Sequence, residues 1–184
     1  MITPDTVAAL LRSFDDPSDG QALKSRELVL LLLEQTPLPF SRRQFKPGHV
    51  TCSGLVLSAD GGRLLLVHHR RLDRWLLPGG HVEPEDPAIE EAARREVVEE
   101  TGAVLATDGT PPLIGVDVHG IPARRDQPYH LHHDLLFLFR AQDDACRVSE
   151  ESRDVLWASP AEFDGYDLPG NIRRAWGRAG GGAP

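Results

Sequence analysis

Residues 79–102 read GGHVEPEDPAIEEAARREVVEETG, a glycine-rich start followed by a segment dense in charged residues. Three of its carboxylates, Glu96, Glu99 and Glu100, are related by the spacings i, i+3 and i+4. On a helix, side chains at these spacings share one face, and three carboxylates on one face repel one another unless a cation compensates. Oxygen ligands of this kind favour Mg²⁺, with Mn²⁺ as the alternative, and Mg²⁺ commonly joins carboxylates to phosphates. The segment therefore predicts a divalent-metal site on a helix.

Two further features of the segment support this interpretation. Arg95 lies four residues after Glu91 and four before Glu99, where it can orient a carboxylate rather than bind metal. Gly80 lies in the preceding loop, where its backbone carbonyl can reach the same metal. A Glu-Glu pair alone is more typical of a solvated helix face. The ordered combination of Gly-Gly, Arg-Glu and Glu-Glu-x-Gly favours the metal site instead.

In this order the residues resemble the box of the Nudix hydrolase superfamily, G-x5-E-x7-R-E-U-x-E-E-x-G-U, where U is a bulky aliphatic residue. The sixth residue after Gly80 is Asp86 rather than Glu, and the spacer from Asp86 to Arg95 is one residue longer than the pattern. Glu85 is the alternative candidate for that acidic role, and the final U position is Ala103. The positions that match the pattern are Gly80, Arg95, Glu96, Val97, Glu99, Glu100 and Gly102.

The resemblance implies a Nudix-type α/β/α sandwich with a mixed sheet, preceded by an N-terminal helical extension. It implies a Mg²⁺-dependent pyrophosphohydrolase that cleaves a phosphoanhydride bond, in a nucleoside diphosphate linked to another moiety or in a nucleoside triphosphate. The general base would be Glu99 or a carboxylate of a distant loop, for which Glu150 and Glu151 are candidates. The residues implied for catalysis are Arg95, Glu96, Glu99 and Glu100, and those implied for metal binding are Gly80, Glu96, Glu99 and Glu100.

The pattern along the chain predicts three parts. Residues 1–46 form a helical extension, because Thr3-Pro4 is a typical helix start and Val7, Leu10, Leu11 and Phe14 follow at helical spacing; a second helix is expected over 21–35. Residues 47–178 form the Nudix domain, and residues 179–184 a disordered tail. The extension either covers an edge or face of the sheet or serves as a dimer interface or lid. Strands are expected at 50–58, 63–69, 113–119, 129–140 and 155–158, and helices at 85–101 and 171–178.

A second polar cluster lies outside the box. Strand alternation places His130, His132 and Asp134 on one face, and Asp117 and His119 alternate in the same way in the preceding strand. If these strands pair, their polar faces meet. We expect His119, His130, His132 and Asp134 to contact the substrate, and the alternative is a transition-metal site, with Zn²⁺ bound at His130 and His132.

For five other residues the sequence gives weaker evidence of a role in substrate binding. Arg70 and Arg74 precede the box and are predicted to contact an anionic substrate, although arginines near a turn are often only solvated. Trp75, Tyr129 and Phe137 are candidates for stacking on a base, although each is more often a core residue.

The composition limits the classes of function. The chain has 184 residues and a net charge of −8, which argues against a stable nucleic-acid partner because such proteins usually present a basic face. The longest strongly apolar run, residues 28–33, is too short to span a membrane, and the first residues lack a signal-peptide pattern. Cys52 and Cys146 form no CxxC pair, which is typical of a reducing compartment.

We therefore expect a cytoplasmic enzyme with a small, nucleotide-like substrate, and a homodimer is an open alternative. The rival function from another class is a non-catalytic Nudix-fold ligand sensor or binding module. Loss of box carboxylates would favour that rival, and none of the three helix carboxylates is missing.

Overall fold

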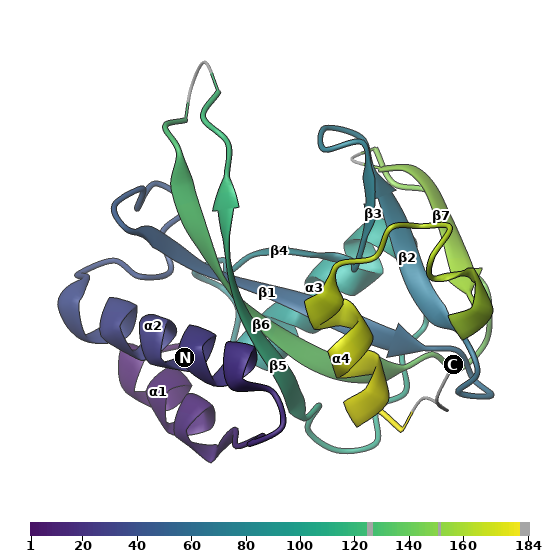
Figure 1. Cartoon of the computed structure of the whole chain (residues 1–184), viewed down its shortest axis with the longest axis horizontal. Coiled ribbons are helices and arrows are strands. Elements are labelled where there is room, and N and C mark those ends of the chain that lie inside the picture. Colours follow the sequence, from purple (N-terminus) through teal and green to yellow (C-terminus); the bar gives the residue numbers. More distant parts are fainter. Residues whose placement is uncertain (125–126, 151, 181–184) are drawn as a thin grey trace.

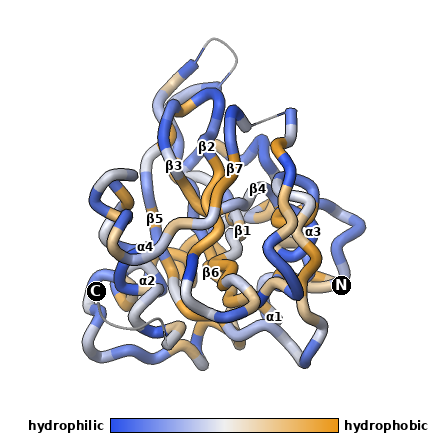
Figure 2. Tube along the Cα trace, turned by 90° about the vertical axis from the view of Figure 1, so that its right-hand side faces the viewer, coloured by the Kyte–Doolittle hydropathy of each residue, from blue (hydrophilic) through white to orange (hydrophobic). Residues whose placement is uncertain are grey.

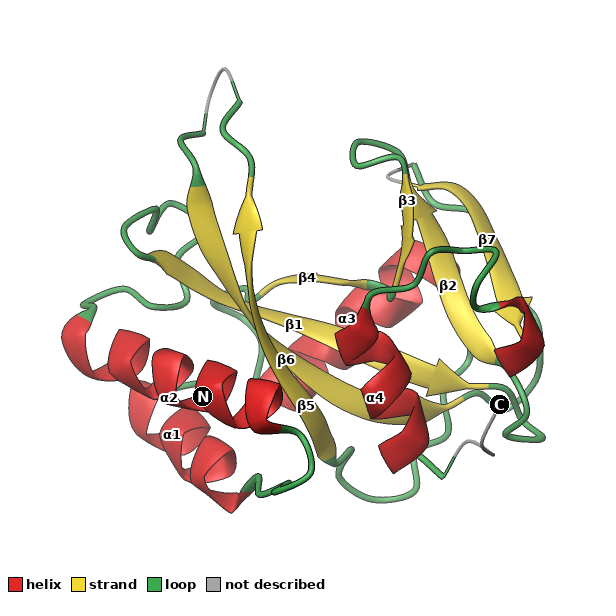
Figure 3. Ribbon diagram, viewed as in Figure 1, coloured by secondary structure: helices red, strands yellow, loops and turns green. Residues whose placement is uncertain are grey.

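A computed structural model describes residues 1–124, 127–150 and 152–180. Its centre is a curled, mixed sheet, with the helices α3 and α4 on opposite faces and the pair α1 and α2 beside one end (Figure 1). Figure 3 shows the same layers coloured by secondary structure. The helices are α1 (Pro4–Ser13), α2 (Gly20–Gln35), α3 (Ile89–Thr101) and α4 (Gly170–Arg178), with a 3-10 turn at Pro160–Glu162. The predicted α/β/α sandwich with an N-terminal helical extension is confirmed.

The sheet has the strand order β3-β2-β1-β6-β5, to which β4 is added beside β1 and β7 beside β2. The two long central strands, β1 and β6, run parallel, and the other pairs are antiparallel. The strands are β1 (Gly48–Leu57), β2 (Leu64–His69), β3 (Arg74–Leu76), β4 (Gly79–His81), β5 (Leu113–Ile121), β6 (His130–Arg140) and β7 (Ser152–Ala158).

The local sequence explains where the helices begin and end. Thr3 caps α1 through a reciprocal pair of hydrogen bonds with Thr6, and Pro4 occupies the first turn, as the sequence predicts. The side chain of Asp19 accepts a hydrogen bond from the amide of Ala22 and so caps α2. Helix α3 ends at Gly102, whose φ of 64° lies in the left-handed region that favours glycine.

Two expectations about the segment around the box need correction. The helix expected over 85–101 begins only at Ile89, because Pro87 and the extended residue Ala88 interrupt the helical conformation. The glycines before it were expected in a loop, but Gly79–His81 forms the short strand β4, which pairs with residues Thr51 to Ser53 of β1. The backbone of β4 is therefore held in register against the central strand.

The core is divided between the two faces of the sheet. One apolar cluster joins α1, α2 and α3 to β1, β5 and β6, and includes the fully buried Leu11, Val97 and Phe137. The other joins α4 to β1, β2 and β7, and includes Leu55 and Trp176. Figure 2 shows the resulting distribution, with hydrophobic strands in the interior and hydrophilic residues along the loops.

The N-terminal extension is attached to the rest of the chain by both apolar and ionic contacts. Helix α2 packs against the terminal strand β5. Asp19, which is 4% exposed, accepts hydrogen bonds from Arg174 at 2.8 Å and from Arg178 at 2.9 Å, both on α4. The extension is thus part of the packed structure. No helix in the described part of the chain is long and apolar enough to cross a membrane.

Candidate active site

The guanidinium of Arg95 connects three elements of the box. Its Nε and Nη2 each donate to one carboxylate oxygen of Asp86, both at 2.9 Å. Nη2 also donates to the carbonyl of His81 at 2.9 Å, and Nη1 donates to Glu96 at 2.9 Å and to Glu99 at 3.1 Å. A two-pronged contact of this kind fixes orientation as well as charge. The loop, β4 and α3 are therefore fixed relative to one another.

These contacts indicate which acidic residue accompanies the box arginine. Asp86, with a side chain 7% exposed, also accepts the backbone amide of Glu83 at 2.8 Å, whereas Glu85 is exposed. Burial by itself raises the pKa of Asp86, but the hydrogen bonds from Arg95 and from the Glu83 amide outweigh it, and the pKa lies below the ordinary value. Asp86 is thus held as a carboxylate, and the extra residue of the spacer lies before the helix begins.

The three helix carboxylates differ in exposure. Glu96 is 15% exposed on its side chain, and a Cβ atom at Gly80 would lie only 2.6 Å from its Oε2, so a larger residue at position 80 would push the Glu96 carboxylate away from β4. Glu100 is 7% exposed and accepts the amide of Gly79 at 3.0 Å. Glu99 has a side chain 59% exposed. Glu96 lies beside Gly80 and Glu100 beside Gly79, and together with Glu99 on the same helix they supply hard oxygen donors of the kind that Mg²⁺ prefers.

A second set of polar side chains occupies one face of the sheet. The condition set by the sequence is met, because β5 and β6 pair: Asp117 lies opposite Asp134, and His119 lies opposite His132. The Nδ1 atom of His119 is 2.9 Å from Asp117. We call this set the histidine face, and its members are His49, Thr51, Ser53, His81, Asp117, His119, His130, His132 and Asp134.

The sequence pattern alone did not indicate a role for four members of the histidine face, namely His49, Thr51, Ser53 and His81. Thr51 and Ser53 donate hydrogen bonds to Asp134 at 2.9 and 3.0 Å. The polar alternation of residues 49, 51 and 53 along an otherwise apolar strand was a usable signal. That β4 would bring His81 beside them depends on a strand that the sequence did not predict.

Burial controls the charge of the histidine face. It lowers the pKa of His49, and together with the neighbouring imidazoles it lowers that of His81 to about 4 and that of His132 to about 2. These rings are therefore neutral at pH 7. Burial raises the pKa of Asp134, although Ser53, Thr51 and the nearby His119 act in the opposite direction.

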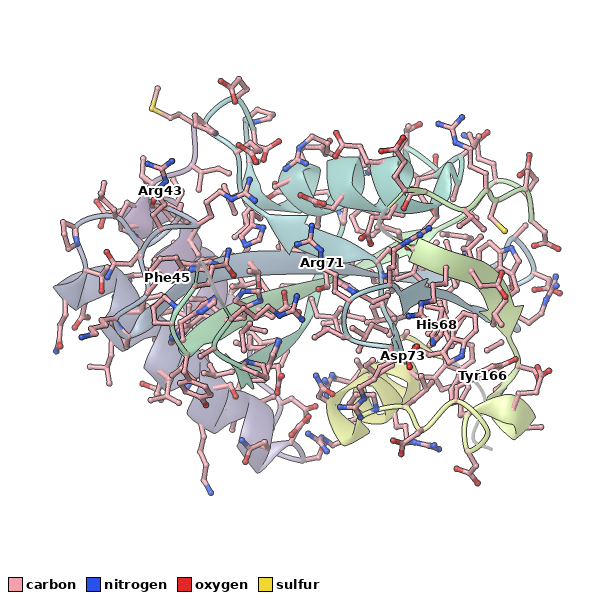
Figure 4. All side chains as sticks on the ribbon, turned by 90° about the horizontal axis from the view of Figure 1, so that it is seen from above. Arg43, Phe45, His68, Arg71, Asp73 and Tyr166 are labelled. Atoms are coloured by element: carbon pink, nitrogen blue, oxygen red, sulfur yellow. The ribbon has the colours of Figure 1, made fainter. Side chains whose placement is uncertain are left out.

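The predicted arginines lie on the β2–β3–β7 side of the molecule. Arg70 donates to the carbonyl of Ser152 at 3.0 Å, and Arg74 lies 3.6 Å from Asp167. These polar partners of the two arginines lie outside the histidine face. In Figure 4, which is seen from above, the neighbouring Arg71 lies between Arg43 and Phe45 on one side and His68, Asp73 and Tyr166 on the other.

The three aromatic candidates for stacking have different surroundings. Phe137 is fully buried in the core, and Tyr129 is 61% exposed beside the β5–β6 loop. Trp75 is half-buried, with its ring 4.9 Å from His68 and 5.2 Å from Tyr166. Of the three, only Trp75 combines partial exposure with aromatic partners. The distant acid Glu150 is exposed in the loop before β7, and Glu151 lies outside the described residues.

Comparison with known proteins gives the family. A sequence profile of the NUDIX domain matches residues 48–175. The chain belongs to the Nudix family. The nucleoside triphosphatase NudI of Escherichia coli O1:K1 / APEC is 34% identical over 99 residues, which cover 52% of this chain and 68% of the relative.

Solved structures agree on the fold. A NUDIX-family hydrolase from Clostridium perfringens has a TM-score of 0.51 at 22% identity, covering 72% of this chain and 96% of its own. An Ap4A hydrolase from C. elegans has a TM-score of 0.51 at 18% identity, covering 70% and 95%. The chain is thus a Nudix hydrolase, an enzyme that acts on acid anhydrides in phosphorus-containing substrates.

Proposed function

We propose that this Nudix hydrolase is a Mg²⁺-dependent pyrophosphohydrolase, with Mn²⁺ as the alternative ion. Its substrate is a nucleoside triphosphate or a nucleoside diphosphate linked to another moiety. The main support for this proposal is the set of hydrogen bonds by which the Arg95 guanidinium holds the carboxylates of Asp86, Glu96 and Glu99 together beside β4. The similarity to a nucleoside triphosphatase supports the triphosphate as the first candidate.

The residues proposed to hold the ion are Glu96, Glu99, Glu100 and the carbonyl of Gly80. When bound, such an ion polarises a phosphate and lowers the pKa of an attacking water. Arg95 contributes by orienting the carboxylates of Glu96 and Glu99, and Glu100 by anchoring the amide of Gly79. These contacts fix the donor atoms before the substrate arrives, which lowers the cost of reorganisation during the reaction.

Glu99 is the proposed general base. Its side chain is the most exposed of the three helix carboxylates, so solvent reaches it, and Arg95 fixes one of its oxygens at 3.1 Å. In the reaction, the water oxygen forms a bond to phosphorus, its proton passes to the carboxylate, and the anhydride P–O bond breaks with release of the second phosphate group. A carboxylate in this position serves both orientation and proton transfer.

The histidine face, with His119, His130, His132 and Asp134, is proposed to contact the substrate, and Arg70 and Arg74 are proposed as contacts for an anionic group. Support comes from Arg95, which donates to the carbonyl of His81 at 2.9 Å and so ties the strand that carries His81 to the carboxylate cluster. We further propose that the enzyme is cytoplasmic and acts on small molecules without a stable nucleic-acid partner, consistent with its net charge of −8.

The decisive test is a substrate panel. Purified protein is incubated with nucleoside triphosphates, dinucleoside polyphosphates, nucleotide sugars and ADP-ribose, each with Mg²⁺, with Mn²⁺ or with chelator, and released phosphate or nucleotide is measured. We expect hydrolysis of at least one compound with the metal and none with chelator. Hydrolysis that is insensitive to chelator would contradict the metal-dependent mechanism. Absence of hydrolysis across the panel would favour the non-catalytic sensor or binding module.

A further inference from the structure

Three histidines from three different strands converge on the histidine face. His49 of β1 lies in register with His132 of β6, and His81 of β4 lies in register with Thr51, two residues further along β1. Each ring offers one nitrogen, and these three nitrogens all lie within 4.8 Å of one another. The ring centres are separated by 5.1 Å (His49–His81), 4.9 Å (His49–His132) and 5.6 Å (His81–His132). Figure 1 shows the three strands side by side at the centre of the molecule.

The hydrogen bonds of His49 identify which of its nitrogens is available. Its Nδ1 lies 3.1 Å from the carbonyl oxygen of Gln44, and because a carbonyl only accepts, Nδ1 carries the proton. The lone pair is therefore on Nε2. Metal-bound histidines generally have this arrangement, in which the second ring nitrogen donates to a backbone carbonyl or a carboxylate.

The Nε2 atom of His49 is the strongest indication of a ligand. The residue is 1% exposed, and Nε2 is buried with no hydrogen-bond partner among the described residues. A buried polar atom without a partner is unfavourable, and in native proteins it usually marks a site for water, an ion or a ligand. Here the atom belongs to the ring that both other histidines contact.

A fourth imidazole lies next to the three. His130 donates from Nδ1 to the carbonyl of Pro128 at 2.9 Å, so its Nε2 also carries the lone pair, and its ring stacks on His49 at 5.1 Å. Either this nitrogen or a water molecule can fill a fourth position. Three or four imidazole nitrogens in a compact group suit Zn²⁺, whereas Mg²⁺ requires oxygen ligands.

We propose that His49, His81 and His132 form a Zn²⁺ site on the histidine face, separate from the carboxylate cluster of α3. The two sets of ligands are different in chemistry but adjacent in sequence, since His81 directly follows Gly80. A Zn²⁺ ion there would place a positive charge on the face proposed to contact the substrate, which would favour an anionic phosphate chain. The site does not depend on the proposed Mg²⁺-dependent reaction, and its binding is measurable without substrate.

The test uses the full-length protein, freed of metal with chelator and then dialysed. Zn²⁺ alone is titrated by calorimetry, and Co²⁺ is used as a spectroscopic probe because its visible absorption distinguishes a four-coordinate nitrogen site from a six-coordinate oxygen site. We expect one equivalent of Zn²⁺ to bind, and an intense four-coordinate spectrum with Co²⁺. We expect His81→Ala and His132→Ala each to weaken Zn²⁺ binding by about 100-fold or more.

Two controls separate the site from alternatives. His68→Ala removes a histidine that lies beside Trp75, and Glu99→Gln removes a carboxylate of α3; both are expected to leave Zn²⁺ affinity unchanged. Thermal unfolding followed by circular dichroism reports whether each variant is folded, and Zn²⁺ is expected to raise the melting temperature of the wild type but not that of the two histidine variants. Failure of the wild type to bind Zn²⁺, or equal affinity in wild type and in His132→Ala, would overturn the proposal. Loss of Zn²⁺ in Glu99→Gln, with retention in His132→Ala, would assign the ion to the carboxylates instead.

Discussion

The carboxylate cluster of α3 and the histidine face lie on either side of the same short strand, yet they are assembled in different ways. The cluster takes Glu96, Glu99 and Glu100 from one helix, so their proximity follows from helical spacing alone. The histidine face takes its members from β1, β4, β5 and β6, so their proximity depends on strand order and register. Because the two regions share no side chains, a substitution in one leaves the other intact. Variants can therefore test the proposed catalytic role of the carboxylates separately from the proposed substrate contacts of the histidine face.

The largest effect is expected in the carboxylate cluster. Glu99→Gln and Glu100→Gln should each lower kcat by about 100-fold or more, because each removes a charge that we propose holds the ion. The measurement is turnover at saturating Mg²⁺, with circular dichroism to verify the fold. Glu90→Gln, in the first turn of the same helix, is the matched control and should retain full turnover. Wild-type activity in both Glu99→Gln and Glu100→Gln would refute the helix-centred mechanism.

A smaller effect is expected where the loop meets the helix. Arg95→Lys keeps the positive charge but loses the two-pronged contact with Asp86 and the contacts with Glu96 and Glu99, so kcat should fall by about 30-fold.

The two acidic candidates of the loop provide a matched pair for the same region. Asp86→Asn should lower activity and thermal stability, whereas Glu85→Gln, on an exposed side chain, should change neither. If Asp86→Asn instead left activity and stability unchanged while Glu85→Gln lowered them, Glu85 rather than Asp86 would be the acidic residue of the box.

Variants of the histidine face should affect a different kinetic parameter. His130→Ala lies outside the three proposed Zn²⁺ ligands and removes one proposed substrate contact. We expect KM to rise by about tenfold while kcat stays within about twofold, which is the pattern for a contact made equally in the ground state and the transition state. Steady-state kinetics on the substrate found in the panel provides the measurement. A fall in kcat with unchanged KM would place His130 in the chemical step instead.

The smallest effect on catalysis is expected from Asp19, which belongs to neither region. Burial raises the pKa of Asp19, but the hydrogen bonds from the Ala22 amide, Arg174 and Arg178 lower it to about 2 overall. Because the folded pKa lies below the unfolded value, its contribution of about 2 kcal/mol is present above pH 4 and is lost as the pH falls from about 4 to 2.

Asp19→Asn should therefore reduce the free energy of unfolding at pH 7 by about that amount while leaving kcat and KM unchanged. Denaturant titrations between pH 7 and pH 2 provide the measurement, and the difference between wild type and variant should shrink as the pH falls below 4. An equal difference at every pH would show that the charge of Asp19 is not the cause.

The difference between the two regions also explains what the sequence could predict. The box residues Arg95 to Gly102 are local, so their shared helix face followed from spacing. Strand alternation likewise placed Asp117 and His119 on one face, whereas their pairing with β6 remained a condition that the structure meets. The sequence could not show whether Asp86 or Glu85 binds Arg95, because the answer depends on where Pro87 allows the helix to begin. The place of His81 did not follow either, since β4 is only three residues long and is held by pairing with β1 rather than by its own sequence pattern.

The attachment of α1 and α2 has a consequence for the order of folding. The other elements that α1 and α2 contact all come later in the chain and are synthesised after them. These elements include β5 and the two arginines of α4 that bind Asp19. A pair of short helices has little stability by itself, so on the ribosome it remains undocked until those later elements have emerged. Contacts that are so distant along the chain raise the contact order and slow folding. We therefore expect α1 and α2 to join the structure late, although they are made before the elements that they contact.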